Sequence, residues 1–99
     1  MDALEIGIEE QEDQVLVRLS GTLDGRAARM VADTLGRLPP RPLVVDFSRV
    51  RTFVDLAIDG LTRALRGRTV RLTGLGRHQQ RMFRYFGIPP TEPGRPAEA

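Results

Sequence analysis

The stretch PPRPLVVDFSRVRTFVDLAIDGLTRAL, residues 39–65, contains a predicted strand that leads into a predicted helix, and the fold is best predicted from this pair. Proline interrupts helical hydrogen bonding, so PPRP at 39–42 ends any helix that precedes it. The valine-rich run LVVDF at 43–47 is typical of a central parallel strand that is buried on both faces. The apolar residues that follow recur three and four apart, which predicts a helix with one buried face: Ala57, Ile58, Leu61, Ala64 and Leu65. A strand that leads into such a helix indicates an α/β domain.

The N-terminal segment predicts a β-hairpin. Leu4, Ile6 and Ile8 alternate with glutamate and glycine, which is the period of a half-buried strand. The charged turn EQEDQ at 10–14 separates this run from a second apolar run at 15–19. Two such runs on either side of a short polar turn are typical of antiparallel strands.

Two further helices and one more strand complete the predicted order. SGTLDG at 20–25 predicts a loop in which Asp24 caps the next helix. The helix predicted over 26–38 has an apolar face formed by Ala28, Val31, Leu35 and Leu38. TVRL at 69–72 predicts a strand, and GRHQQRMFRYFGI at 76–88 predicts a helix with Met82, Phe83 and Phe86 turned inward and Gly87 as its left-handed end. The order is therefore β-β-α-β-α-β-α, a small α/β domain with a mixed, mostly parallel sheet of about four strands and three helices.

Composition narrows the class of protein. The chain of 99 residues suits one domain, and its 40% hydrophobic and 28% charged residues are ordinary for a globular protein. The absence of cysteine excludes disulfides, thiolate metal sites and thiol nucleophiles. No apolar run is long enough to cross a bilayer, and MDALEIGIEE lacks the features of a secretory signal. We therefore expect a cytoplasmic protein that is not inserted into a membrane.

The charges are distributed unevenly. All fifteen basic residues are arginine, and the net charge is +2. Residues 1–24 hold seven acids and one arginine, whereas residues 60–91 hold no acid and seven arginines: Arg63, Arg66, Arg68, Arg71, Arg77, Arg81 and Arg84. Such asymmetry fits a nucleic-acid partner, an acidic protein partner, or acidic and basic faces of one fold that attract each other.

The sequence offers no catalytic or metal-binding constellation. His78 is the single histidine, and neither a second histidine nor a cysteine is present to complete a transition-metal site. GLGRHQ at 74–79 has Gln79 where a dinucleotide-binding loop needs its third glycine. Asp46, Asp55 and Asp59 lack the spacing of a metal loop, and Asp46 is best suited to bonding with loop backbone. We therefore expect no enzymatic activity, no cofactor and no metal.

Three motifs carry a resemblance to a known family. GTLD at 21–24 follows the second predicted strand, VVDFSRV at 44–50 spans the third, and GRHQQRMFRYFGI at 76–88 closes the domain. In this order they resemble the STAS domain family of bacterial anti-sigma factor antagonists, over residues 4–88. The resemblance implies a single STAS-like domain at 1–88, followed by a proline-rich segment at 89–99 that we expect to be disordered.

The chain departs from the family at the motif D-S-S-G-L or D-S-T-G-L, where a partner kinase phosphorylates a serine or threonine. Counting from Val50 without a gap places VDLAI, residues 54–58, on these five positions. A gap of one residue places Leu56 and Ala57 on the two hydroxyl positions instead. In both registers the phosphoacceptor position is apolar, so the off-switch of the family is absent.

The resemblance implies a non-catalytic module that binds a partner kinase or related regulator constitutively. The implied partner-binding residues lie around the start of the second helix and the preceding GTLDG loop: Asp24, Gly25, Asp55, Leu56, Ala57 and Asp59. Two alternatives remain: a STAS-type accessory subunit of a transport ATPase complex, and an arginine-rich domain that binds nucleic acid or another anion. Whether Leu56 is exposed or belongs to the core also stays open.

Overall fold

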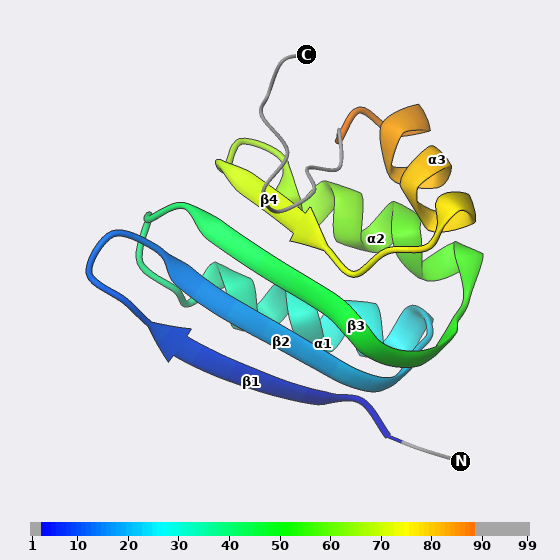
Figure 1. The fold of residues 1–99 in the computed structure, drawn as a ribbon, viewed down its shortest axis with the longest axis horizontal. Coiled ribbons are helices and arrows are strands. Elements are labelled where there is room, and N and C mark those ends of the chain that lie inside the picture. The colour runs from blue at the N-terminus through cyan, green and yellow to red at the C-terminus, as the bar shows by residue number, and fades with distance from the viewer. Residues whose placement is uncertain (1–2, 89–99) are drawn as a thin grey trace.

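The computed structural model describes residues 3–88, and it has the predicted order of strands and helices (Figure 1). The elements are β1 (Glu5–Glu10), β2 (Val15–Leu23), α1 (Gly25–Gly36), β3 (Leu43–Phe53), α2 (Asp55–Leu65), β4 (Val70–Thr73) and α3 (Arg77–Tyr85). The segment 89–99, which the sequence predicts to be disordered, lies outside the described residues.

The four strands form one mixed sheet in the order β1-β2-β3-β4. β1 pairs antiparallel with β2, while β2, β3 and β4 run parallel to one another. The run at 43–47 therefore lies in an interior strand of the sheet, as predicted. Because β2 and β3 are parallel, their C-terminal ends lie at the same edge of the sheet. There β2 leads into α1 and β3 leads into α2.

The core lies between the sheet and the three helices. Alternate residues of β2 are almost fully buried and the residues between them are not, so one face of the strand supplies the core. α1 and α2 lie side by side behind the sheet in Figure 1. Phe83 of α3 joins the same core, with its ring 5.8 Å from that of Phe47 on β3. The inward residues predicted for the second helix are confirmed, Ala64 being the least buried of them.

The prediction that residues 43–47 are buried on both faces is wrong. Leu43, Val45 and Phe47 are buried, but Val44 and Asp46 are only half-buried. The cause is the one-sided placement of the helices, which leaves the other face of the sheet partly open to solvent. At the β1 edge Ile8 is also more exposed than its alternation predicts.

β2 and β3 extend further than the sequence predicts. The segments predicted as a loop and as a lead into the second helix, 20–23 and 48–53, continue the two strands. Their pairing persists because register shifts near Ser20 and Gly21 absorb the irregular geometry. Gly21 has φ of 103°, and a Cβ there would collide with the carbonyl oxygen of Ala3, so only glycine fits.

Candidate functional site

The starts of α1 and α2 lie next to each other at one edge of the sheet. Leu23 pairs with Phe53 at the ends of the two parallel strands, and the Val54 amide donates to the Leu23 carbonyl over 2.9 Å. Each strand then turns into its helix within two residues, at Gly25 and Asp55. The strand ends thus bring together two segments that lie some thirty residues apart in the sequence.

Asp24 builds the start of α1. Its Oδ1 accepts a hydrogen bond of 2.9 Å from the Ala27 amide, which satisfies one of the free N–H groups of the first turn. The predicted capping role is therefore confirmed. Gly25 is the first helical residue. Asp24 and Gly25 are both half-buried. The Asp24 carboxylate holds the helix in place while remaining accessible at this edge.

The start of α2 is organised differently. Val54 occupies the N-cap position and makes no side-chain cap bond, so the first turn keeps free amides. Asp55 is the first helical residue, where its negative charge complements the helix dipole. Both of its carboxylate oxygens lie 3.0 Å from Nε2 of His78 on α3. Both side chains are more than half exposed, so this contact links the two helices at the surface.

The contact between Asp55 and His78 was not predicted. The sequence gives no signal for it, because 23 residues separate the two positions and no local motif joins them. Only the packing of α3 against α2 brings them together. A carboxylate beside a histidine is also found in catalytic sites, but neither a nucleophile nor an enclosed cleft accompanies this pair among the described residues.

Leu56 lies on the surface. Its exposed fraction is 74%, while the next two residues, Ala57 and Ile58, are fully buried. Successive helical residues are turned by about 100°, so the spacing that directs these two residues to the core directs Leu56 away from it. The alternative that Leu56 belongs to the core is thereby removed. Ala57 does not reach the surface, so it cannot contact a partner as the resemblance implied.

Asp59 completes the acidic positions on this part of α2. Its carboxylate lies 3.1 Å from Nη2 of Arg63, one turn further along the helix. This exposed ion pair reduces the free charge of Asp59 and contributes little to stability. Of the six predicted partner-binding residues, Asp55 and Leu56 are the most exposed, Asp24, Gly25 and Asp59 are half-buried, and Ala57 is buried.

Asp46 and Thr62 have structural roles. Asp46 accepts hydrogen bonds from the amide and hydroxyl of Ser48, at 3.0 and 3.1 Å, and from the Thr73 hydroxyl at 3.2 Å. Asp46 therefore bonds to backbone as expected, but that backbone belongs to β3 and not to a loop. Thr62 is buried, and its hydroxyl donates to the Ile58 carbonyl over 2.7 Å.

Residues 3–88 contain no group of three histidine, cysteine or acidic side chains that could hold a metal ion. None of the helices described is both long and apolar enough to cross a membrane. A shallow hollow of about 670 Å³ lies over β1, β2 and β3, where Ser20, Ser48 and Arg49 contribute to its lining. The neighbouring helix starts therefore remain the strongest candidate for a functional site.

Comparison with protein families identifies one match over most of the chain. The family model described as "Mlab, STAS domain" matches residues 6–89. This range includes both helix starts, the intervening sheet and α3. A search of curated protein sequences finds no match.

Three solved structures illustrate the similarity in fold. An anti-sigma factor antagonist from Mycobacterium paratuberculosis has a TM-score of 0.68 and 20% identity, with 91% of this chain and 88% of that chain covered. The unphosphorylated anti-sigma factor antagonist SpoIIAA has a TM-score of 0.62 and 18% identity, with coverage of 88% and 87%. A variant of RsbS from Moorella thermoacetica has a TM-score of 0.65 and 17% identity, with coverage of 88% and 86%. At these identities the likeness concerns the fold.

Proposed function

The chain belongs to the STAS domain family, and from this membership we propose that it is a non-catalytic regulatory module that binds a protein partner. The proposed binding surface is formed by the adjoining starts of α1 and α2, with Leu56 at its centre and Asp24, Asp55 and Asp59 around it. The partner class is a switch kinase or related regulator, since two of the similar structures are titled anti-sigma factor antagonists.

The exposure of Leu56 is the observation that carries this proposal. An exposed leucine alone is common on protein surfaces. Here, however, it occupies the first turn of a helix whose amides have no side-chain cap, next to the exposed side chain of Asp55. Complete burial of a leucine side chain against a partner stabilises a complex by about 1.5–3 kcal/mol. The upper part of this range exceeds the loss of about 2 kcal/mol that marks an energetically important contact of an interface.

The lack of a hydroxyl at this helix start supports constitutive binding. Residues 54–58 are VDLAI, which offers no acceptor for a phosphate. A phosphate at such a position would add about two negative charges and three acceptor oxygens. These would change the charge of the binding surface and therefore the affinity for the partner. Without an acceptor, the interaction is controlled by the abundance of the protein and its partner.

The test begins with a photo-crosslinking amino acid at position 56, used to capture the partner from native lysate for identification by mass spectrometry. Binding of that partner is then measured by calorimetry with the unmodified chain and with Leu56→Arg. We expect Leu56→Arg to weaken binding at least tenfold, because it places a charge in an apolar contact, and to leave the thermal midpoint nearly unchanged. Met30→Arg, at an exposed apolar position of α1, is the matched control.

Unaltered affinity in Leu56→Arg would overturn the proposed binding surface. A large loss of stability in the same variant would instead show that the side chain contributes to the core. Equal weakening by Leu56→Arg and Met30→Arg would point to a general charge effect and would likewise contradict the proposal.

A further inference from the structure

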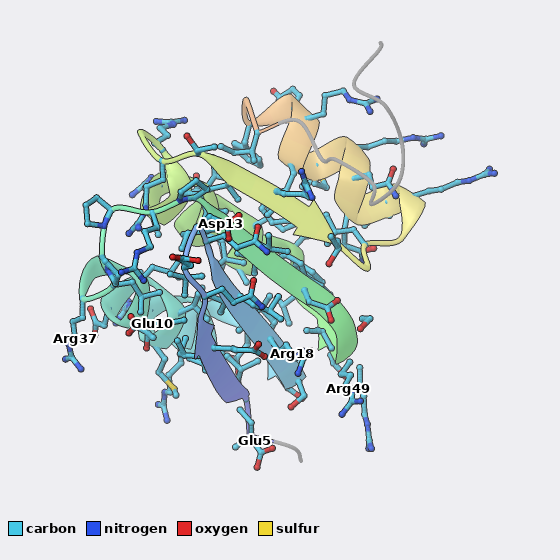
Figure 2. All side chains as sticks on the ribbon, turned by 60° about the vertical axis from the view of Figure 1, so that its left-hand side comes forward. Glu5, Glu10, Asp13, Arg18, Arg37 and Arg49 are labelled. Atoms are coloured by element: carbon cyan, nitrogen blue, oxygen red, sulfur yellow. The ribbon has the colours of Figure 1, made fainter. Side chains whose placement is uncertain are left out.

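The acidic and basic segments of the chain lie at opposite edges of the sheet. Glu5 and Glu10 of β1 and Asp13 of the hairpin lie at one edge (Figure 2). α3 lies beyond β4 and α2, at the other side of the molecule (Figure 1). The interpretation that acidic and basic faces of this fold attract each other is therefore not supported for β1 and α3. On the acidic edge Glu10 pairs instead with Arg41, which precedes β3.

The exposed face of α3 combines three arginines with an aromatic ring. Helical spacing places Arg77, Arg81, Arg84 and Tyr85 on the side opposite the buried Phe83. None of the three guanidinium groups has an ion pair or hydrogen bond within residues 3–88. Tyr85 is 83% exposed and packs edge-on against Phe86, with ring centroids 5.3 Å apart, so the ring is held in place at the surface.

Two of the other four arginines of the basic segment are already engaged. Arg63 pairs with Asp59, and Arg68 donates to the carbonyls of Leu35 and Pro39. The unpaired charge of this segment is therefore concentrated on α3 more than the sequence alone indicates. Arginine and tyrosine are also the residue types that are enriched at protein interfaces and at their energetic centres.

We propose that this face of α3 forms a second part of the docking surface and receives an acidic patch of the protein partner. The inference rests on the proposed function, because it concerns the chemistry of the same partner. The contact between Asp55 and His78 joins the start of α2 to the start of α3, so Leu56 and Arg77 belong to adjoining helix ends. The partner thus needs an apolar pocket for Leu56 and carboxylates placed to pair with the arginines of α3.

A protein fits this surface better than a nucleic acid does. α3 has nine residues, so it spans about 13 Å, and it offers three arginines where DNA-binding surfaces commonly make six or more phosphate contacts. Asp55 and Asp59 on the adjoining helix would repel a continuous phosphate backbone. A compact acidic patch can contact the arginines without passing over these carboxylates.

The first test uses a hexaglutamate peptide as a defined probe, titrated into ¹⁵N-labelled protein at low salt. We expect amide shifts within residues 77–86, with affinity reduced at least threefold in Arg81→Gln and lost in the triple variant at 77, 81 and 84. Arg29→Gln, at an exposed position of α1, removes the same charge and is expected to leave the titration unchanged. Equal weakening by Arg29→Gln, or shifts spread evenly over the surface, would overturn the inference.

Duplex DNA and phosphatidylglycerol vesicles serve as competing probes in the same experiment. Tighter binding of either one through residues 77–86 would reassign the α3 face to a nucleic acid or to a lipid surface. Weaker binding of both than of the peptide supports an acidic protein.

The second test uses the protein captured through position 56. We expect Arg81→Glu to weaken its binding about tenfold at low salt. The binding that remains should depend less on salt than that of Arg29→Glu, because the attraction that salt screens has been removed. If Arg81→Glu has no effect while Leu56→Arg abolishes binding, the α3 inference fails and the proposed function stands. If Leu56→Arg has no effect, the proposed function itself fails.

Discussion

Leu56 is exposed although the two residues that follow it in the same helix are buried. The sequence places it in an apolar run with Ala57 and Ile58, so its hydrophobicity alone predicts nothing about its direction. The helix directs its two neighbours against the sheet and leaves Leu56 exposed. At the same end of α2, Asp55 contacts His78, so adjacent residues have an apolar and an electrostatic role.

At the residue scale we predict that the protein is not phosphorylated at the start of α2. Incubation with ATP and a serine kinase of the captured partner's type should leave its intact mass unchanged, because residues 54–58 contain no hydroxyl. Leu56→Ser restores a hydroxyl at an exposed position and is expected to gain one phosphate.

A stoichiometric mass gain in the unmodified protein that maps to residues 50–62 would contradict this prediction. The hydroxyls in that range are Thr52, exposed on β3, and Thr62, buried and bonded to the Ile58 carbonyl. Neither lies at the free amides of the α2 start, where a phosphate would be favoured.

Among the elements, the loop after α1 depends on a side chain from a distant part of the chain. Arg68 lies just before β4, and its guanidinium donates to the Leu35 carbonyl over 2.9 Å and to the Pro39 carbonyl over 2.6 Å. Leu35 lies in the last turn of α1, where carbonyl groups have no partner within the helix. Arg68 thus connects the end of α1 to the segment before β4 by hydrogen bonds.

We predict that Arg68→Met destabilises the fold by about 1.5–3 kcal/mol, the range for hydrogen bonds that involve a charged group. Methionine keeps most of the aliphatic stem, so the loss reports the hydrogen bonds of the guanidinium to the carbonyls of Leu35, Pro39 and Arg41. The free energy of unfolding from urea titration is the measurement. Arg66→Met, at an exposed neighbouring position, should change it by less than about 0.5 kcal/mol, and equal losses in both variants would contradict the structural role.

At the scale of the whole molecule, residues 3–88 form a sheet covered by helices on one face, and the residues just after α3 pack against the core. Gly87 has φ of 95°, and the Ile88 amide donates to the Phe83 carbonyl over 2.8 Å. Phe86 and Ile88 are half-buried against the core. This arrangement supports the prediction that a stable domain needs no residue beyond 88.

A chain that ends at Ile88 is therefore expected to unfold at nearly the same temperature as the full chain. A chain that ends at Tyr85 loses two half-buried apolar side chains and should be less stable by about 2–4 kcal/mol. Differential scanning calorimetry of the three chains measures this. A large loss in the chain that ends at Ile88 would show that residues 89–99 contribute to the fold.

The sequence by itself determined the order of the elements, the interior strand and the inward faces of the helices. These follow from local chemistry: proline ends a helix, valine-rich runs form buried strands, and apolar spacing orients a helix. The same local reasoning correctly assigned the caps at Asp24 and Gly87.

Only the tertiary structure decided which of these segments adjoin and which face outward. The lengths of β2 and β3 depend on their pairing with each other, and the exposure of Val44 depends on the absence of a helix over that face among the described residues. The contact between Asp55 and His78 and the bonds of Arg68 join residues 23 to 33 positions apart. No local pattern encodes such contacts, because they arise when helices pack on a sheet whose strand order brings distant segments together.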